Sequence, residues 1–155
     1  QQVYCSHFKY ALVAHWQQLI SEHASLEGKA LLLPVRINLA KEDLKSLTEE
    51  QSWFTLLGFE LVIEKQFVIV KKLPHGLYLL DVNQALESLL QACKNKFENL
   101  DDWLKWQCRH VPERYFTSNA FAAELSKMKN NPQTIQRLRS KAVKIDIHHY
   151  LTQLD

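Results

Sequence analysis

Apolar residues in the first part of the chain recur at helical spacing and then change to a short continuous run. The stripe within residues 6–22 is Phe8, Ala11, Leu12, His15, Trp16 and Leu19. This spacing predicts a helix, and Ser6 is expected to cap its first turn. Residues 31–37 are mostly apolar and too few for a helix, so they predict a strand. Pro34 lacks a backbone donor, which confines that strand to a sheet edge or a bulge.

The next segment predicts a helix followed by a hairpin. Residues 41–57 carry apolar side chains along one helical face, and Gly58 is positioned to end that helix. Phe59, Leu61 and Ile63 then alternate as in a strand, and residues 67–72 are predicted to return as the second strand of the hairpin. Residues 64–66 are polar and are expected to form the turn between them.

The second half is predicted to be mainly helical. The segments with helical spacing are residues 82–94, 101–111, 120–129 and 134–139. Asp101 is expected to cap the second of them. Residues 142–147 alternate as a strand does, and a short helix follows from His148. An isolated strand cannot satisfy its own backbone, so its expected partner is residues 3–5 or a strand of another chain.

This order of elements predicts an α/β (α+β) protein with two lobes. Residues 28–97 would form an inserted lobe made of a β-α-β-β unit and a helix. Residues 1–27 and 98–155 would form the second lobe, built from both chain ends.

Composition predicts a globular chain that does not span a membrane and that lies in a reducing compartment. Of the 155 residues, 46% are apolar and 23% are charged, which is typical of a globular chain and excludes a disordered one. No apolar run reaches the roughly 18 residues that span a bilayer, and the first residues lack the pattern of a signal peptide. Cys5, Cys93 and Cys108 are odd in number and widely spaced, which favours reduced thiols and a cytoplasmic location.

Charge is distributed unevenly along the chain. Residues 105–144 contain nine basic residues and two acidic ones. Such a stretch predicts either solvated helix faces or a surface for phosphate or an acidic partner. The residues predicted to contact DNA in the second case are Lys127, Lys129, Arg137, Arg139 and Lys141.

No arrangement of residues predicts a catalytic, cofactor or metal site. Cys108 has the basic neighbours Arg109 and His110, but it lies on an apolar helical stripe, which favours a buried structural thiol. The histidines are interpreted as surface or capping residues; they are His7, His15, His23, His75, His110, His148 and His149. The paired carboxylates fall at helix starts or on exposed helical faces, and no glycine-rich phosphate loop occurs.

Three segments nevertheless carry a family resemblance. Residues 29–74, residues 100–110 (LDDWLKWQCRH) and residues 142–154 (AVKIDIHHYLTQL) resemble, in this order, the C-terminal domain of the MutL family of DNA mismatch-repair proteins. The resemblance implies a homodimerisation lobe and an inserted regulatory lobe. It also implies an ATP-binding region outside this chain, and partners that include the mismatch-recognition protein MutS, a nicking endonuclease, a helicase and a sliding clamp. The expected location is the bacterial cytoplasm, at the nucleoid during repair.

The resemblance also bears on nuclease activity. Many MutL proteins carry a metal-dependent nuclease in this domain, marked by a DQHA-x2-E-x4-E motif, which is absent from this sequence. Gln107-Cys108-Arg109 echoes a second nuclease motif only in part. The chain therefore resembles the nuclease-free type, which acts with a separate endonuclease.

A third feature of the family is a clamp-binding motif, Gln-x-Leu-Leu-x-Pro. The matching residues are Leu31, Leu32 and Pro34, with Lys29 in place of the glutamine. The resemblance implies that this segment docks in a pocket of the sliding clamp. The alternative is an ordinary buried strand, which the preference of leucine for protein interiors favours.

Overall fold

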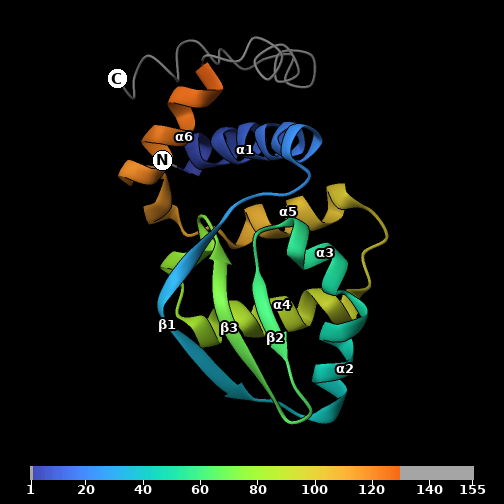
Figure 1. Ribbon diagram of the computed structural model, residues 1–155. Helices are drawn as coiled ribbons and strands as arrows, with labels where there is room; N and C mark the ends of the chain where they lie inside the picture. Colours follow the sequence, from blue (N-terminus) through green and yellow to red (C-terminus); the bar gives the residue numbers. More distant parts are fainter. Residues whose placement is uncertain (1, 130–155) are drawn as a thin grey trace.

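The computed structural model describes the backbone of residues 2–129 and the side chains of residues 9–128 (Figure 1). Its elements are α1 (Gln2–His23), β1 (Gly28–Asn38), α2 (Lys41–Glu49), α3 (Gln51–Leu56), β2 (Glu60–Ile63), β3 (Phe67–Pro74), α4 (Val82–Asn95), α5 (Leu100–His110) and α6 (Asn119–Lys129). Short 3₁₀ turns occupy Leu77–Leu79 and Glu113–Thr117. The described part is a mixture of helices and one small antiparallel sheet, so its class is α+β.

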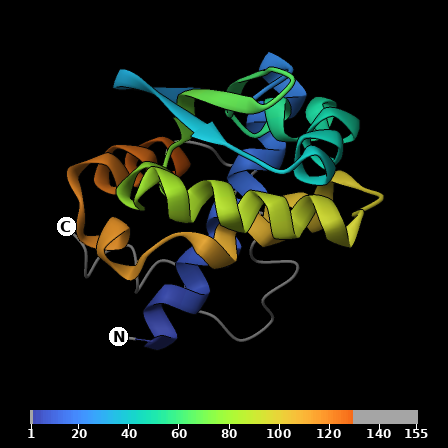
Figure 2. The ribbon, with the colours of Figure 1, turned by 90° about the horizontal axis from the view of Figure 1, so that it is seen from below.

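The sheet has three strands in the order β1-β3-β2, with β3 antiparallel to both neighbours. Val68 and Val70 of β3 are completely buried, whereas Phe67 and Ile69 between them are only half-buried. This alternation gives the sheet one core-facing side and one open side. Figure 2 shows α4 running along the core-facing side, while no described helix covers the opposite face. β1 forms one edge, as Pro34 predicts.

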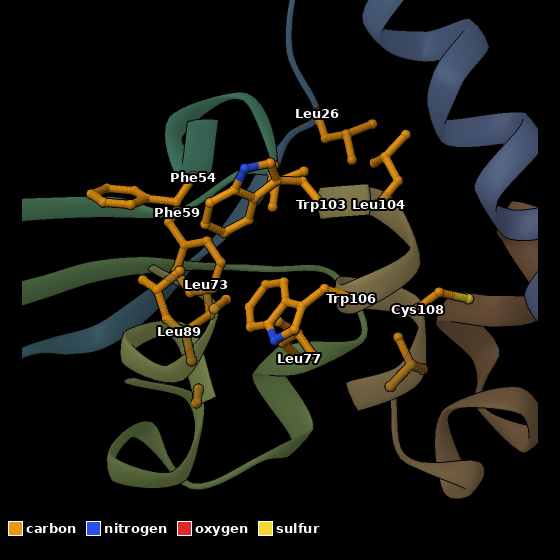
Figure 3. Close-up of a cluster of buried hydrophobic side chains, with 14 of the residues drawn as sticks. Leu26, Phe54, Phe59, Leu73, Leu77, Leu89, Trp103, Leu104, Trp106 and Cys108 are labelled. Atoms are coloured by element: carbon orange, nitrogen blue, oxygen red, sulfur yellow. The ribbon is translucent and has the colours of Figure 1, made fainter. Parts of the chain in front are cut away.

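Aromatic side chains of α5 join the sheet to the helices. Trp103 and Trp106 pack edge to face, with ring centroids 5.8 Å apart, and Trp106 also contacts Phe59. Figure 3 shows Trp103, Trp106 and Phe59 in one buried cluster, with Leu73 beside the rings and Leu77 below Trp106. Both tryptophans are at most 3% exposed, so the cluster is the centre of the core.

Several predicted elements have different limits in the structure. The helix predicted for residues 41–57 is broken at Glu50 (φ −103°, ψ 11°) into α2 and α3, and Gln51, which follows the break, is exposed. Gly58 ends the segment with φ +106°, as predicted. Asp101 is not a cap: the Asn99 side chain accepts a 2.8 Å hydrogen bond from the backbone N–H of Asp102 instead.

The prediction for the N-terminal residues was wrong. Residues 3–5 lie inside α1, which begins at Gln2, and are not a strand. Ser6 therefore lies within the helix and cannot cap it. Extending an existing helix adds one backbone hydrogen bond for each residue that it orders, so a helix forms here more readily than a three-residue strand. The helix predicted for residues 134–139, the strand for residues 142–147 and the helix from His148 lie outside the described residues.

Candidate partner-binding site at the bulge of strand β1

A large irregularity interrupts the pairing of β1 with β3. Ala30 lies opposite Lys72 and Val35 lies opposite Val70, with a register shift between the two pairs. Residues 31–34 of β1 consequently face a single residue of β3, Lys71. A strand with extra residues must arch away from its partner, so this segment protrudes from the sheet edge.

The arch exposes most of its apolar side chains. Leu32 is 103% exposed and Leu33 is 78% exposed, while Pro34 is also exposed and Leu31 is half-buried against the core. The strand itself was correctly predicted, but the expected burial of its leucines was wrong. The register shift is the reason, because residues in a bulge do not follow the alternation that buries one face of a strand.

Cationic side chains border the arch on both strands. Lys29 precedes it, with its Nζ 4.0 Å from the ring centroid of Tyr78. Arg36 follows it, with its guanidinium 3.7 Å from the centroid of the Phe67 ring. Lys71 lies opposite the arch on β3 and is exposed. The site is thus an apolar protrusion bordered by positive charge, and the sequence did not identify Leu33, Arg36 or Lys71 as part of it.

The predicted site residues have two different outcomes. Leu31, Leu32 and Pro34 lie together in the arch, as adjacent members of one protruding segment. Of the predicted DNA contacts, Lys127 is exposed on α6 and Lys129 is the last residue of that helix. Arg137, Arg139 and Lys141 lie outside the described residues.

His15 was wrongly predicted to be a surface residue. It is 3% exposed and lies between α1 and α6, with its Nε2 3.5 Å from Oε1 of Glu124. Burial lowers the pKa of His15, against the opposing effect of the Glu124 charge, and Lys127 lowers it further. Glu124 also accepts a 3.3 Å hydrogen bond from Nε1 of Trp16. His15 is a member of the apolar stripe of α1, and this position could have predicted its burial.

The described cysteines are structural, as predicted for Cys108. Burial raises the pKa of both Cys93 and Cys108 to about 12. The Sγ of Cys108 donates a 3.2 Å hydrogen bond to the carbonyl oxygen of Lys9. A thiol with so high a pKa is almost entirely protonated at neutral pH and is therefore a poor nucleophile.

Two of the hollows on the surface are lined entirely by described residues. One, of about 710 Å³, is lined by two basic residues, Lys9 and Arg109, and by two acidic ones, Glu87 and Glu113, so it carries no excess of either charge from these side chains. The other, of about 530 Å³, is lined by residues of α1, α5 and α6, including Gln107. Among residues 9–128, no group of three or more histidine, cysteine or carboxylate side chains could hold a metal ion. Within the described helices, none is long and apolar enough to cross a membrane.

Two comparisons with known proteins show what this chain is similar to. The family model described as the MutL C terminal dimerisation domain matches residues 12–115. Over all 155 residues, the chain is 66% identical to the DNA mismatch repair protein MutL of Pseudoalteromonas translucida (strain TAC 125). The chain spans 25% of the length of that relative.

Proposed function

Because the chain belongs to the family of MutL C-terminal dimerisation domains, we propose that it holds together two subunits of a DNA mismatch-repair protein. It also presents surfaces that link mismatch recognition by MutS to a nicking endonuclease and a helicase. The family match across residues 12–115 is the observation that carries this proposal. Its setting is the bacterial cytoplasm, at the nucleoid during repair.

The proposed division of labour assigns dimerisation to residues 1–27 and 98–155, and regulation to residues 28–97. The contacts of α1 support this grouping, and α5 additionally packs against the sheet through Trp106 and Phe59. α1 is joined to α6 by the hydrogen bond of Trp16 to Glu124, and to α5 by that of Gln17 to Asp101, 2.9 Å long. The whole sheet and α4 fall within residues 28–97.

Sedimentation equilibrium of the full-length protein at micromolar concentration should give the mass of a dimer; a monomer would contradict the proposal.

We further propose that this domain has no nuclease activity of its own. The supporting observation is the missing DQHA-x2-E-x4-E string in the sequence. Full-length protein incubated with manganese and supercoiled plasmid should produce no more nicked circles than an unrelated protein purified in the same way. Nicking that rises with protein concentration would refute this assignment.

The arch of β1 is the proposed contact with the sliding clamp. Leu32 and Leu33 are presented to solvent beside Pro34, and Leu31 anchors the segment to the core. An apolar segment of this kind gains free energy when a partner's pocket removes it from water. Replacing Leu32 and Leu33 with serine should weaken clamp binding at least tenfold in an equilibrium binding assay. Unchanged affinity would exclude the arch as the contact.

A second candidate function is sequence-independent DNA binding by a basic C-terminal face. The exposed Lys127 on α6 and the excess of basic residues in residues 105–144 favour it. Such binding should be weak and should decrease steeply with salt, because phosphate contacts release counterions. The proposed contacts are Lys127, Lys129, Arg137, Arg139 and Lys141. Charge reversal at Arg137 and Arg139 should weaken DNA binding, and an unchanged affinity would remove this candidate.

A further inference from the structure

We infer that the arch is the centre of a larger docking surface, in which Arg36 and Lys71 bind carboxylates that border the partner's apolar pocket. This inference rests on the proposed clamp contact and adds to it. It identifies a second set of contacts outside the leucine–proline segment, and it specifies the chemistry of the partner surface that receives them: an apolar pocket with an acidic rim.

The positions of the two cations carry the inference. Lys71 is the single β3 residue opposite the arch, and Arg36 is the second residue after Pro34 on β1. Neither forms an ion pair within the described residues, whereas the neighbouring Lys72 lies 3.7 Å from Glu60. Arg36 and Lys71, like Lys29 before the arch, therefore border the exposed leucines without a described carboxylate partner, while the adjacent Lys72 is paired with Glu60. A carboxylate of a partner could therefore bind Arg36 or Lys71 without displacing a carboxylate of the described residues.

The open face of the sheet extends this surface. Arg36 pairs with Ile69 of β3, and Ile69 pairs with Val62 of β2. Residues opposite one another in a sheet project from the same face, so these three form a row on the side that no described helix covers (Figure 2). Val62 and Ile69 are half-buried. They supply an aliphatic surface next to Arg36, on the same face of the sheet.

Arg36 is better prepared for binding than Lys71. Its guanidinium rests on the ring of Phe67, at 3.7 Å from the centroid, which restricts the side chain before any partner arrives. A restricted side chain loses less conformational freedom on binding, and a guanidinium can bind a carboxylate through two parallel hydrogen bonds. Loss of Arg36 should therefore weaken binding more than loss of Lys71.

The same observations favour a protein partner over a nucleic acid. Single-strand binders use open aromatic faces on which bases stack, but the aromatic ring of Phe67 on this surface is already in contact with Arg36. Leu32, Leu33, Val62 and Ile69 offer aliphatic contact that phosphates cannot use. So few cations also supply little counterion release.

The test measures binding of the full-length protein to the purified sliding clamp encoded by the same genome, at several salt concentrations. The test variant carries Arg36→Glu and Lys71→Glu. The control carries Lys41→Glu and Lys96→Glu, which make the same charge change at exposed positions outside the sheet that form no ion pair among the described residues. A milder pair, Arg36→Gln and Lys71→Gln, guards against misfolding, and circular dichroism verifies the fold of each variant.

We expect the test variant to bind the clamp about tenfold more weakly at low salt, with a smaller salt dependence, because charges at an interface rim act largely through electrostatic attraction. The control should change affinity less than twofold, and the glutamine pair should give an intermediate loss.

If the leucine variants abolish binding while the charge reversal leaves it within twofold, the inference is overturned and the clamp contact stands. If the native protein does not bind the clamp, both are overturned. If a labelled single-stranded oligonucleotide loses binding and the clamp does not, the surface serves nucleic acid and the inference fails.

Discussion

Exposure of the arch makes a quantitative prediction about stability. Replacing Leu32 and Leu33 with alanine should change the free energy of unfolding very little. Leu32 is 103% exposed, so burial of its side chain contributes nothing to the free energy of folding. Leu33 is 78% exposed, so it contributes about a fifth of what a fully buried leucine does. Complete burial of a leucine contributes about 1.5–3 kcal/mol. The double variant should therefore lose less than about 0.7 kcal/mol on the same scale.

Leu73 provides a matched control two positions beyond Lys71 on β3. It is 1% exposed and packs in the cluster of Figure 3. Leu73→Ala removes the same atoms from a buried position and leaves a cavity, which costs about 2–5 kcal/mol. The same chemical change thus has effects several-fold different at the two sites, because only one of them removes apolar surface from water.

Urea unfolding of the full chain, followed by tryptophan fluorescence, measures both variants. The signal includes that of the buried Trp16, Trp103 and Trp106, whose surroundings change on unfolding. The urea dependence should stay equal to that of the native chain, so that midpoints report stability directly. A loss of 2 kcal/mol or more in the double alanine variant would refute the reasoning, since it would mean that the arch is buried in the native protein.

Three further predictions concern the interior. Gly28→Ala should destabilise the chain by more than about 2 kcal/mol in the same urea assay, because its Cβ would overlap the carbonyl oxygen of Gly58; an unchanged midpoint would contradict this. Burial lowers the pKa of His15, so as the pH falls His15 is protonated in the unfolded chain before it is protonated in the folded chain. The stability contributed by neutral His15 is therefore present above about pH 6.5 and lost as the pH falls, by up to about 1.4 kcal/mol per pH unit. His15→Phe should flatten the decline between pH 7 and pH 5, and an identical decline would exclude His15 as its source. Cys93 and Cys108 should resist iodoacetamide at pH 8, as measured by peptide mass spectrometry, and react only in urea; rapid labelling of either without urea would refute their burial.

Periodicity predicted those parts of the fold whose burial follows their own sequence. The alternation of Phe59, Leu61 and Ile63 predicted a strand, and in β2 Leu61 is buried between the exposed Glu60 and the half-buried Val62. The apolar stripe of residues 82–94 became α4, with Leu86 and Leu89 in the core. In each segment the side-chain pattern and the local backbone geometry agree, so no information from distant residues is needed.

The arch could not be predicted in this way. A continuous run of leucines has no alternation, so it does not specify which side chains face the core. Their exposure depends on the register shift against β3, a property of the pairing between two strands and not of either alone. Lys71 is a neighbour of the arch for the same reason. His15 is the opposite case. Its place in the apolar stripe of α1 was sufficient to predict its burial, but because histidine is polar it was predicted to lie at the surface.

The composition of the arch also distinguishes two reasons for its existence. Bulges, prolines and charged residues on an edge strand prevent it from pairing with other chains, and β1 has all three in the arch, Pro34 and Arg36. Protection of the edge requires no exposed leucine, however, and polar residues would serve it at lower risk of aggregation. Leu32 and Leu33 add that risk without contributing to the core. A partner that buries them accounts for both the bulge and its leucines, whereas edge protection accounts only for the bulge.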